Sequence, residues 1–238
     1  TFGDGGPLLE FVYLLTQTTT LRQRLESQVN RIRDEIREKN LAPDELQFLR
    51  LTATATAYEA RLNTRKLIGS LNLPDPDRTL QFYEKEYLMR VSSDGQYIEG
   101  LHAIRSGILV DLLTSVDVNP WLEAAVEALP LIIEEDLESF ILHTLVDRPS
   151  PEHTSFIETV TKLSPSTWAG LAGVLRGLLW SDAREYIKAN QSTIEAAREE
   201  FGPGWYFIVD LNFSGSEGPN IDRWWADEKL SNLFSKER

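Results

Sequence analysis

Histidine chemistry is the first activity that this sequence could support, because imidazole donates, accepts and ligates near neutral pH. The chain contains three histidines, His102, His143 and His153, and no cysteine. None of them stands in a His-Glu-x-x-His metal pair, and no Gly-x-Ser-x-Gly nucleophile motif accompanies them. The adjacent carboxylates at 134–136 would point to different faces of a helix, so they do not make an acid–base pair. We therefore expect that the chain is not an enzyme by itself.

His102 has the most informative surroundings of the three histidines. It follows a predicted β-hairpin, with an apolar run at 87–91, a Ser-Asp-Gly turn at 93–95 and a second extended run that ends at Leu101-His102. A helix is predicted directly afterwards, over 103–116. At this hairpin–helix joint the imidazole could donate to an anionic ligand, or it could be a partly buried residue that caps the joint.

The elements before the hairpin predict a winged helix. We expect a helix over 44–62, a short helix over 64–71 and, after a Pro-Asp-Pro-Asp turn, a third helix over 78–86. Helix, short helix, turn, helix and hairpin is the winged-helix order, and the hairpin must pack on these helices because it cannot bury both faces alone. The alternating alanines and threonines at 53–57 should let another helix approach closely.

An amphipathic helix is predicted ahead of the winged helix. Six basic side chains between residues 22 and 39 share its outer faces with four acidic ones, so pairing at helical spacing favours a solvated face over a nucleic-acid stripe. Its apolar stripe consists of residues at steps of four and three, namely Leu21, Leu25, Val29, Ile32 and Ile36.

The second half of the chain also has helical patterning. Three glycines at near-helical spacing, Gly170, Gly173 and Gly177, predict a helix packed closely against a neighbour. The expected segments are helices at 121–129, 131–145, 152–162, 167–180 and 181–200, a linker at 147–151, a strand-like run at 205–211 and a short last helix that contains Trp224 and Trp225. The fold class that follows is mainly α, with a helical bundle, a winged helix with a small β-hairpin and a further α-helical region.

Three domains are predicted from these elements. They are a helical segment at 1–42, the winged helix at 43–118 and a helical domain at 119–238, for which an α-solenoid is one alternative.

The charge distribution argues against phosphate backbones as partners. The formal net charge is −13, and residues 119–238 hold 20 acidic against 10 basic side chains. The predicted third helix, which would enter the DNA groove in many winged helices, has four acids against two bases between residues 75 and 86. No apolar run long enough to span a membrane occurs, so we expect neither nucleic acid nor membrane as a partner, and a cytoplasmic location.

Two short motifs resemble those of the STAND NTPases, the signal-transduction ATPases of the NB-ARC and NACHT type. Gly5-Gly6-Pro7-Leu8-Leu9 is similar to the Gly-x-Pro motif that opens their helical lid. Gly100-Leu101-His102-Ala103-Ile104-Arg105 is similar to the Met-His-Asp motif that ends their winged helix, with Ala103 where the family often has aspartate. The two motifs enclose a predicted helical bundle and winged helix, which is the order found in the family, and the resemblance covers residues 1 to about 118.

The resemblance implies a role for three residues. Pro7 would pack on the adenine, and His102 would hold the β-phosphate of bound ADP in the resting state. Arg105 is a second candidate for the phosphate, or a surface ion-pair partner. ADP or ATP would be bound only in the parent protein, whose P-loop and metal-binding acid would lie in an NTPase domain upstream of Thr1, so that this chain would be a fragment.

The resemblance also implies partners and a biological setting. Residues 119–238 would sense an unknown protein trigger, and activation would involve homo-oligomers, in a prokaryotic signalling or antiviral defence switch.

Two hypotheses from other classes stay open. One is a helical protein-interaction scaffold whose winged helix is purely structural, and the other is a DNA-binding winged-helix regulator.

Overall fold

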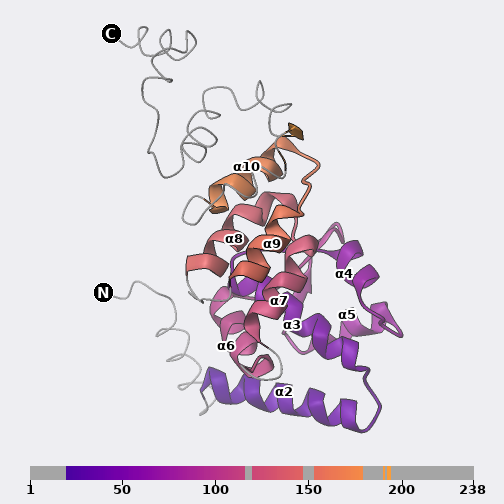
Figure 1. The fold of residues 1–238 in the computed structure, drawn as a ribbon. Helices are drawn as coiled ribbons and strands as arrows, with labels where there is room; N and C mark the ends of the chain where they lie inside the picture. The colour runs from indigo at the N-terminus through magenta and orange to yellow at the C-terminus, as the bar shows by residue number, and fades with distance from the viewer. Residues whose placement is uncertain (1–19, 116–119, 147–152, 179–189, 191, 194–238) are drawn as a thin grey trace, which may run out of the picture. The chain divides into compact units, whose positions relative to one another are not determined.

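The computed structural model describes residues 20–115, 120–146, 153–178, 190 and 192–193. Across these residues the fold is mainly α-helical with a small three-stranded antiparallel sheet, which confirms the predicted fold class (Figure 1). The chain divides into two compact units, and the division falls after Ile133. The predicted linker at 147–151, the strand-like run at 205–211 and the last helix with Trp224 and Trp225 lie outside the described residues.

The first unit contains the predicted winged-helix elements in the predicted order. Its elements are α2 (Leu21–Arg37), α3 (Pro43–Ala57), β1 (Leu62–Asn63), α4 (Thr64–Ser70), α5 (Pro76–Lys85), β2 (Met89–Val91), β3 (Tyr97–Gly100), α6 (Ala103–Leu113), α7 (Trp121–Ala128) and the 3-10 helix η1 (Leu129–Leu131). The hairpin of β2 and β3 is the one that the sequence predicts.

The sheet has the strand order β1-β3-β2, with both neighbours of β3 antiparallel to it. Ile98 lies at its centre, opposite Leu62 on one side and Val91 on the other, and its side chain is fully buried. The short strand β1 was not predicted, because two residues carry no periodic signal. The helix predicted over 44–62 instead ends at Ala57.

Aromatic packing joins α5 to α3. The rings of Phe48 and Tyr83 are stacked, with centroids 5.8 Å apart and planes 2° from parallel, and both side chains are fully buried. The Tyr83 hydroxyl donates to the main-chain oxygen of Glu45 over 2.6 Å. Burial, assisted by the nearby Glu45 carboxylate, raises the pKa of Tyr83 far above its ordinary value, so the hydroxyl stays protonated and keeps donating.

The small side chains in the middle of α3 admit α6, as the sequence predicts. Ala53 and Ala55 are buried, and α6 packs against α3. At the end of β3, the Gly100 amide donates to the Thr56 hydroxyl over 2.6 Å, and a Cβ at Gly100 would collide with the Ser106 hydroxyl. This close approach fixes the end of the hairpin against α3 and the first turns of α6.

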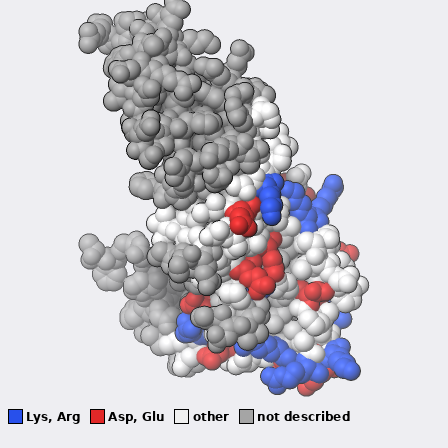
Figure 2. Space-filling view, viewed as in Figure 1, with Lys and Arg blue, Asp and Glu red and all other residues white. Residues whose placement is uncertain are grey.

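The helix α2 packs against the C-terminal end of α6 (Figure 1). Arg22 forms an ion pair with Asp111 at 3.7 Å, and Arg33 donates to the main-chain oxygen of Leu112 over 2.7 Å. Basic side chains line the edge of the molecule that α2 forms in Figure 1, with acidic ones among them (Figure 2). Four members of the predicted apolar stripe are buried and Ile36 is half-buried.

Two further arginines of α2, Arg31 and Arg37, form ion pairs, and only one of the two pairs is of the kind that the sequence predicts. Arg37 pairs with Asp34 on the same helix at 2.9 Å, as expected for a solvated face. Arg31, however, pairs with Glu86 at the end of α5. Basic residues of this helix therefore help to dock it on its neighbours.

Three helices of the first unit end in the same way, with a non-glycine residue in the left-handed conformation. The residues are Lys39 after α2, Glu59 after α3 and Tyr87 after α5, with φ of 63°, 54° and 55°. In each case two main-chain amides bond back to the last turn in the pattern of a Schellman motif, where glycine is the usual residue. Each of the three side chains therefore imposes backbone strain that glycine would not.

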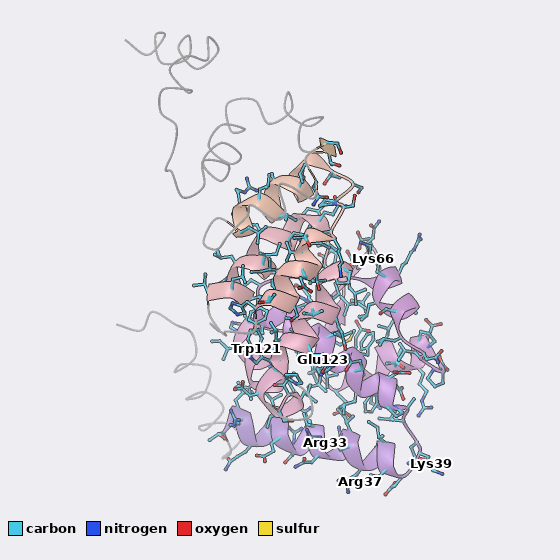
Figure 3. All side chains as sticks on the ribbon, viewed as in Figure 1. Arg33, Arg37, Lys39, Lys66, Trp121 and Glu123 are labelled. Atoms are coloured by element: carbon cyan, nitrogen blue, oxygen red, sulfur yellow. The ribbon has the colours of Figure 1, made fainter. Side chains whose placement is uncertain are left out.

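The helix α7 belongs to the first unit, which ends at Ile133. The helix packs on α3, and the Trp121 ring at its start lies edge-on to Tyr58 with centroids 6.4 Å apart (Figure 3). Beyond η1, Ile132 bridges to Leu62, and the Ile133 amide donates to the main-chain oxygen of Arg61 over 3.1 Å. The chain thus returns to β1 before the second unit begins.

The second unit contains the close helix packing that its glycines predict. Its described elements are the 3-10 helix η2 (Glu134–Asp136), α8 (Leu137–Val146), α9 (Thr154–Thr161) and α10 (Trp168–Gly177). A Cβ at Gly177 would lie 2.8 Å from the Ile141 Cβ, and one at Gly173 would lie 3.3 Å from the Glu138 amide. The two helices α8 and α10 therefore touch at backbone distance. Of the predicted helix at 181–200, nearly all lies outside the described residues.

Glu134 holds the start of α10. Its carboxylate accepts four hydrogen bonds of 2.6–2.9 Å, from the amides and hydroxyls of Ser166 and Thr167. Desolvation, the largest single influence, opposes ionisation, but the four hydrogen bonds together outweigh it and lower the pKa of Glu134 to about 2.

This carboxylate predicts an acid-sensitive α10. Because the folded-state pKa is depressed, the stabilisation from Glu134 is complete above the ordinary pKa of 4.5 and is lost as the pH falls from there toward 2. The protection of the α10 amides, which compares their exchange rate with that of an unfolded chain at the same pH, should therefore fall over this window in the wild-type chain. In a Glu134→Gln variant we expect fast exchange at neutral pH and a weaker pH dependence. Equal pH profiles for the two chains would contradict the assignment.

Candidate functional site

His102 lies at the joint between the hairpin and α6, as the N-cap of that helix. Its backbone is extended, and its side chain is exposed. The Nδ1 atom accepts the Ile104 amide over 3.1 Å. This hydrogen bond requires a bare Nδ1, so the proton of the neutral imidazole is on Nε2. His102 therefore caps the joint and still offers an N–H donor to a ligand.

The start of α6 adds to the attraction for an anion. The first amides of a helix point away from its body, and the helix dipole places partial positive charge at this end. Ala103 is the first residue of the helix and carries no charge, and α6 has no acidic residue in its first turn. An anion near His102 would thus meet a donor and a favourable dipole, without a carboxylate from that turn.

Arg105 forms a hydrogen bond within the first unit. Its guanidinium donates to the main-chain oxygen of Tyr87 over 2.9 Å. Arg105 is half-buried, and this contact ties the first turn of α6 to the corner between α5 and β2. The structure thus brings Arg105 to the same end of the hairpin as His102, with one of its donors committed to the backbone.

Tyr87 is the residue that sequence reasoning missed. Its side chain is 71% exposed, although its backbone is fixed in the left-handed conformation. The ladder pairs Met89 with Gly100, so Tyr87 and His102 flank the same end of the hairpin, each two residues beyond that pair. Tyrosine has high strand propensity, and nothing in the local sequence distinguishes this residue from a first strand residue.

The exposed surface of the helix α5 is poorly suited to binding DNA. Its exposed charged residues are two acids, Asp77 and Glu84, and two bases, Arg78 and Lys85. Arg90 on the hairpin, which would be the wing, pairs with Glu99 on the opposite strand at 2.8 Å. This surface carries no excess of positive charge with which to neutralise phosphates.

Other site types can be assessed over the described part of the chain. There, no cluster of three or more histidine or acidic side chains could hold a metal ion. In the same residues, no helix has the length and apolar character that crossing a membrane requires. Pro7, the third predicted site residue, lies outside the described residues.

Comparisons with known proteins do not add a relative. The chain matches no protein-family model, no curated protein and no solved structure.

Proposed function

We propose that this chain is the regulatory segment of a STAND-type signalling NTPase. Its lid-like and winged-helix parts would form the back of an ADP or ATP site that an upstream NTPase domain completes. The helical second half would couple this site to the recognition of a protein trigger. The segment would supply no hydrolytic residue of its own, and activation would lead to a homo-oligomer.

The observation that carries this proposal is the position of His102. The residue that the motif resemblance assigns to the β-phosphate is exposed, is set at the start of a helix, and keeps its Nε2 donor outward because Nδ1 is occupied by Ile104. A buried imidazole, or one with both nitrogens engaged inside the chain, would have argued against a phosphate contact. The order of elements from α3 to β3 is further support, since the motif ends a winged helix in that family.

Arg105 has a different proposed role from the one that its spacing suggests. Because it donates to the Tyr87 oxygen, it would position the hairpin end beside His102, and the phosphate contact would fall to His102 alone. Ala103 takes the place of the family's usual aspartate, so the Ile104 amide would supply the orientation of the imidazole that a carboxylate could otherwise give.

The test is nucleotide retention in the full-length protein. We expect the purified protein to retain ADP, and His102→Ala to release it about 10 times faster, as befits the loss of one hydrogen bond to a charged group. His153→Ala is the control for loss of a histidine at a helix start, because His153 precedes α9 but its side chain makes no capping hydrogen bond, and it should leave retention unchanged. A full-length sequence without a P-loop, or unchanged ADP release in His102→Ala, would overturn the proposal.

The second candidate function is a protein-interaction scaffold, and the exposed ring of Tyr87 favours it. An exposed aromatic side chain on a well-fixed stretch of backbone is a common anchor in protein interfaces. In that case ADP retention would be absent, and the winged helix would serve only to present the surface.

A further inference from the structure

A surface cavity of about 460 Å³ lies where the end of α2 meets the starts of α3 and α5. This volume is within the range of small-molecule sites. Its apolar wall includes Leu41 and Pro74, and its polar groups come from Lys39, Arg78, Glu45 and Asp75. Every lining residue belongs to the first unit, and none takes part in the site around His102.

The two carboxylates of the cavity already serve the backbone. Glu45 accepts the Ala42 amide over 2.6 Å with one oxygen and the Thr79 hydroxyl over 2.9 Å with the other, and it is 5% exposed. Asp75 caps α5 by accepting the Arg78 amide over 3.0 Å. Their negative charges are thus partly offset by the donors of two helix starts.

The two basic side chains of the cavity, Lys39 and Arg78, have no such charged or capping partners among the described residues. The Lys39 ammonium makes no hydrogen bond or ion pair with any residue that the structure describes, and it stands at the end of α2 beyond Arg37 (Figure 3). The Arg78 guanidinium donates to the main-chain oxygen of Asn40 over 3.2 Å, a neutral acceptor next to Lys39 in the chain. This contact brings the guanidinium from α5 to the turn after α2.

We infer that this cavity binds a small organic acid. Its carboxylate would lie between Lys39 and Arg78, and its short alkyl part would cover Leu41 and Pro74. The guanidinium still has donors beyond the one that it gives to Asn40, and a carboxylate suits its planar geometry. The apolar wall gives the acid an advantage over a bare inorganic anion.

The helix end at Lys39 provides a variant that removes the charge without harming the fold. Because Lys39 has φ of 63°, Lys39→Gly relieves strain, and we expect the melting temperature of the chain to rise by about 2–4 °C. The same variant should weaken the binding of the organic acid about tenfold. Higher stability with weaker binding cannot be explained by loss of structure.

Sodium hexanoate is the probe, titrated into the full chain and followed by NMR. We expect saturable binding with a Kd on the order of 1 mM, with shifts at residues 36–45 and 74–78. Hexanol, which lacks the charge, and inorganic phosphate, which lacks the alkyl chain, should each bind at least about tenfold more weakly. Arg78→Gln, a second variant, should weaken hexanoate binding as well.

The matched control is Glu59→Gly, which relieves the same strain at a helix end that does not line the cavity. It should leave hexanoate binding as in the wild type. Hexanoate that fails to saturate, or that binds Lys39→Gly as tightly as the wild type, would overturn the inference. So would hexanol or phosphate binding as tightly as hexanoate.

Discussion

Replacing Phe48 by alanine is expected to lower the free energy of unfolding of the first unit by about 3–5 kcal/mol. The ring is fully buried and stacked on Tyr83, so its removal leaves a cavity between α3 and α5. It also frees the Tyr83 ring, whose hydroxyl must stay on the Glu45 oxygen for its buried donor to remain paired. Urea unfolding measures this loss of unfolding free energy, and hydrogen exchange of the α3 amides shows where in the unit the protection is lost.

Phe82→Ala is the control for that experiment. Phe82 is adjacent in the chain to Tyr83, and the centroids of their two rings lie 5.2 Å apart, but the Phe82 side chain is only half-buried. Its loss should cost about 1–2 kcal/mol, because less apolar surface is exposed and solvent can fill the space. Equal losses for the two variants would show that the stack with Tyr83 is not the centre of this core.

Replacing Gly177 by alanine is expected to destabilise the second unit by about 1–3 kcal/mol. The added Cβ would lie 2.8 Å from the Cβ of Ile141 and 3.1 Å from the Glu138 oxygen, so α10 would have to move away from α8. Main-chain atoms and a Cβ cannot move aside as the end of a flexible side chain does. The α8 and α10 amides should therefore lose hydrogen-exchange protection.

Gly107→Ala in α6 is the matched control, since a Cβ there would meet nothing within 4 Å. Alanine is favoured over glycine inside a helix, so this variant should gain about 0.5–1 kcal/mol. The same chemical change thus has opposite expected signs at two helical positions. A stabilised Gly177→Ala would contradict the close contact between α8 and α10.

The features that sequence predicted are those with a local signal. The apolar stripe of α2, the turn of the hairpin and the glycines of α10 each depend on spacing within one element, and the structure has them all. His102 was placed at the start of a helix for the same reason.

The features that sequence did not predict depend on contacts between distant elements. Arg31 reaches Glu86 and Arg105 reaches the Tyr87 oxygen, and neither partner follows from helical spacing. The helix α3 stops before its predicted end with Glu59 in the left-handed conformation, although glutamate is a good helix former. At the candidate site, therefore, the histidine could be predicted, whereas the support that Arg105 gives to the hairpin could not.

The bridge between Leu62 and Ile132 has a consequence for the order in which the first unit folds. Leu62 of strand β1 pairs with Ile98 and also bridges to Ile132, so both of its partners lie much later in the chain. Contacts at such separations require long loops to close, which slows folding compared with helices alone. During synthesis, the helices α2 to α6 can form early, but the unit is complete only once residue 133 has left the ribosome.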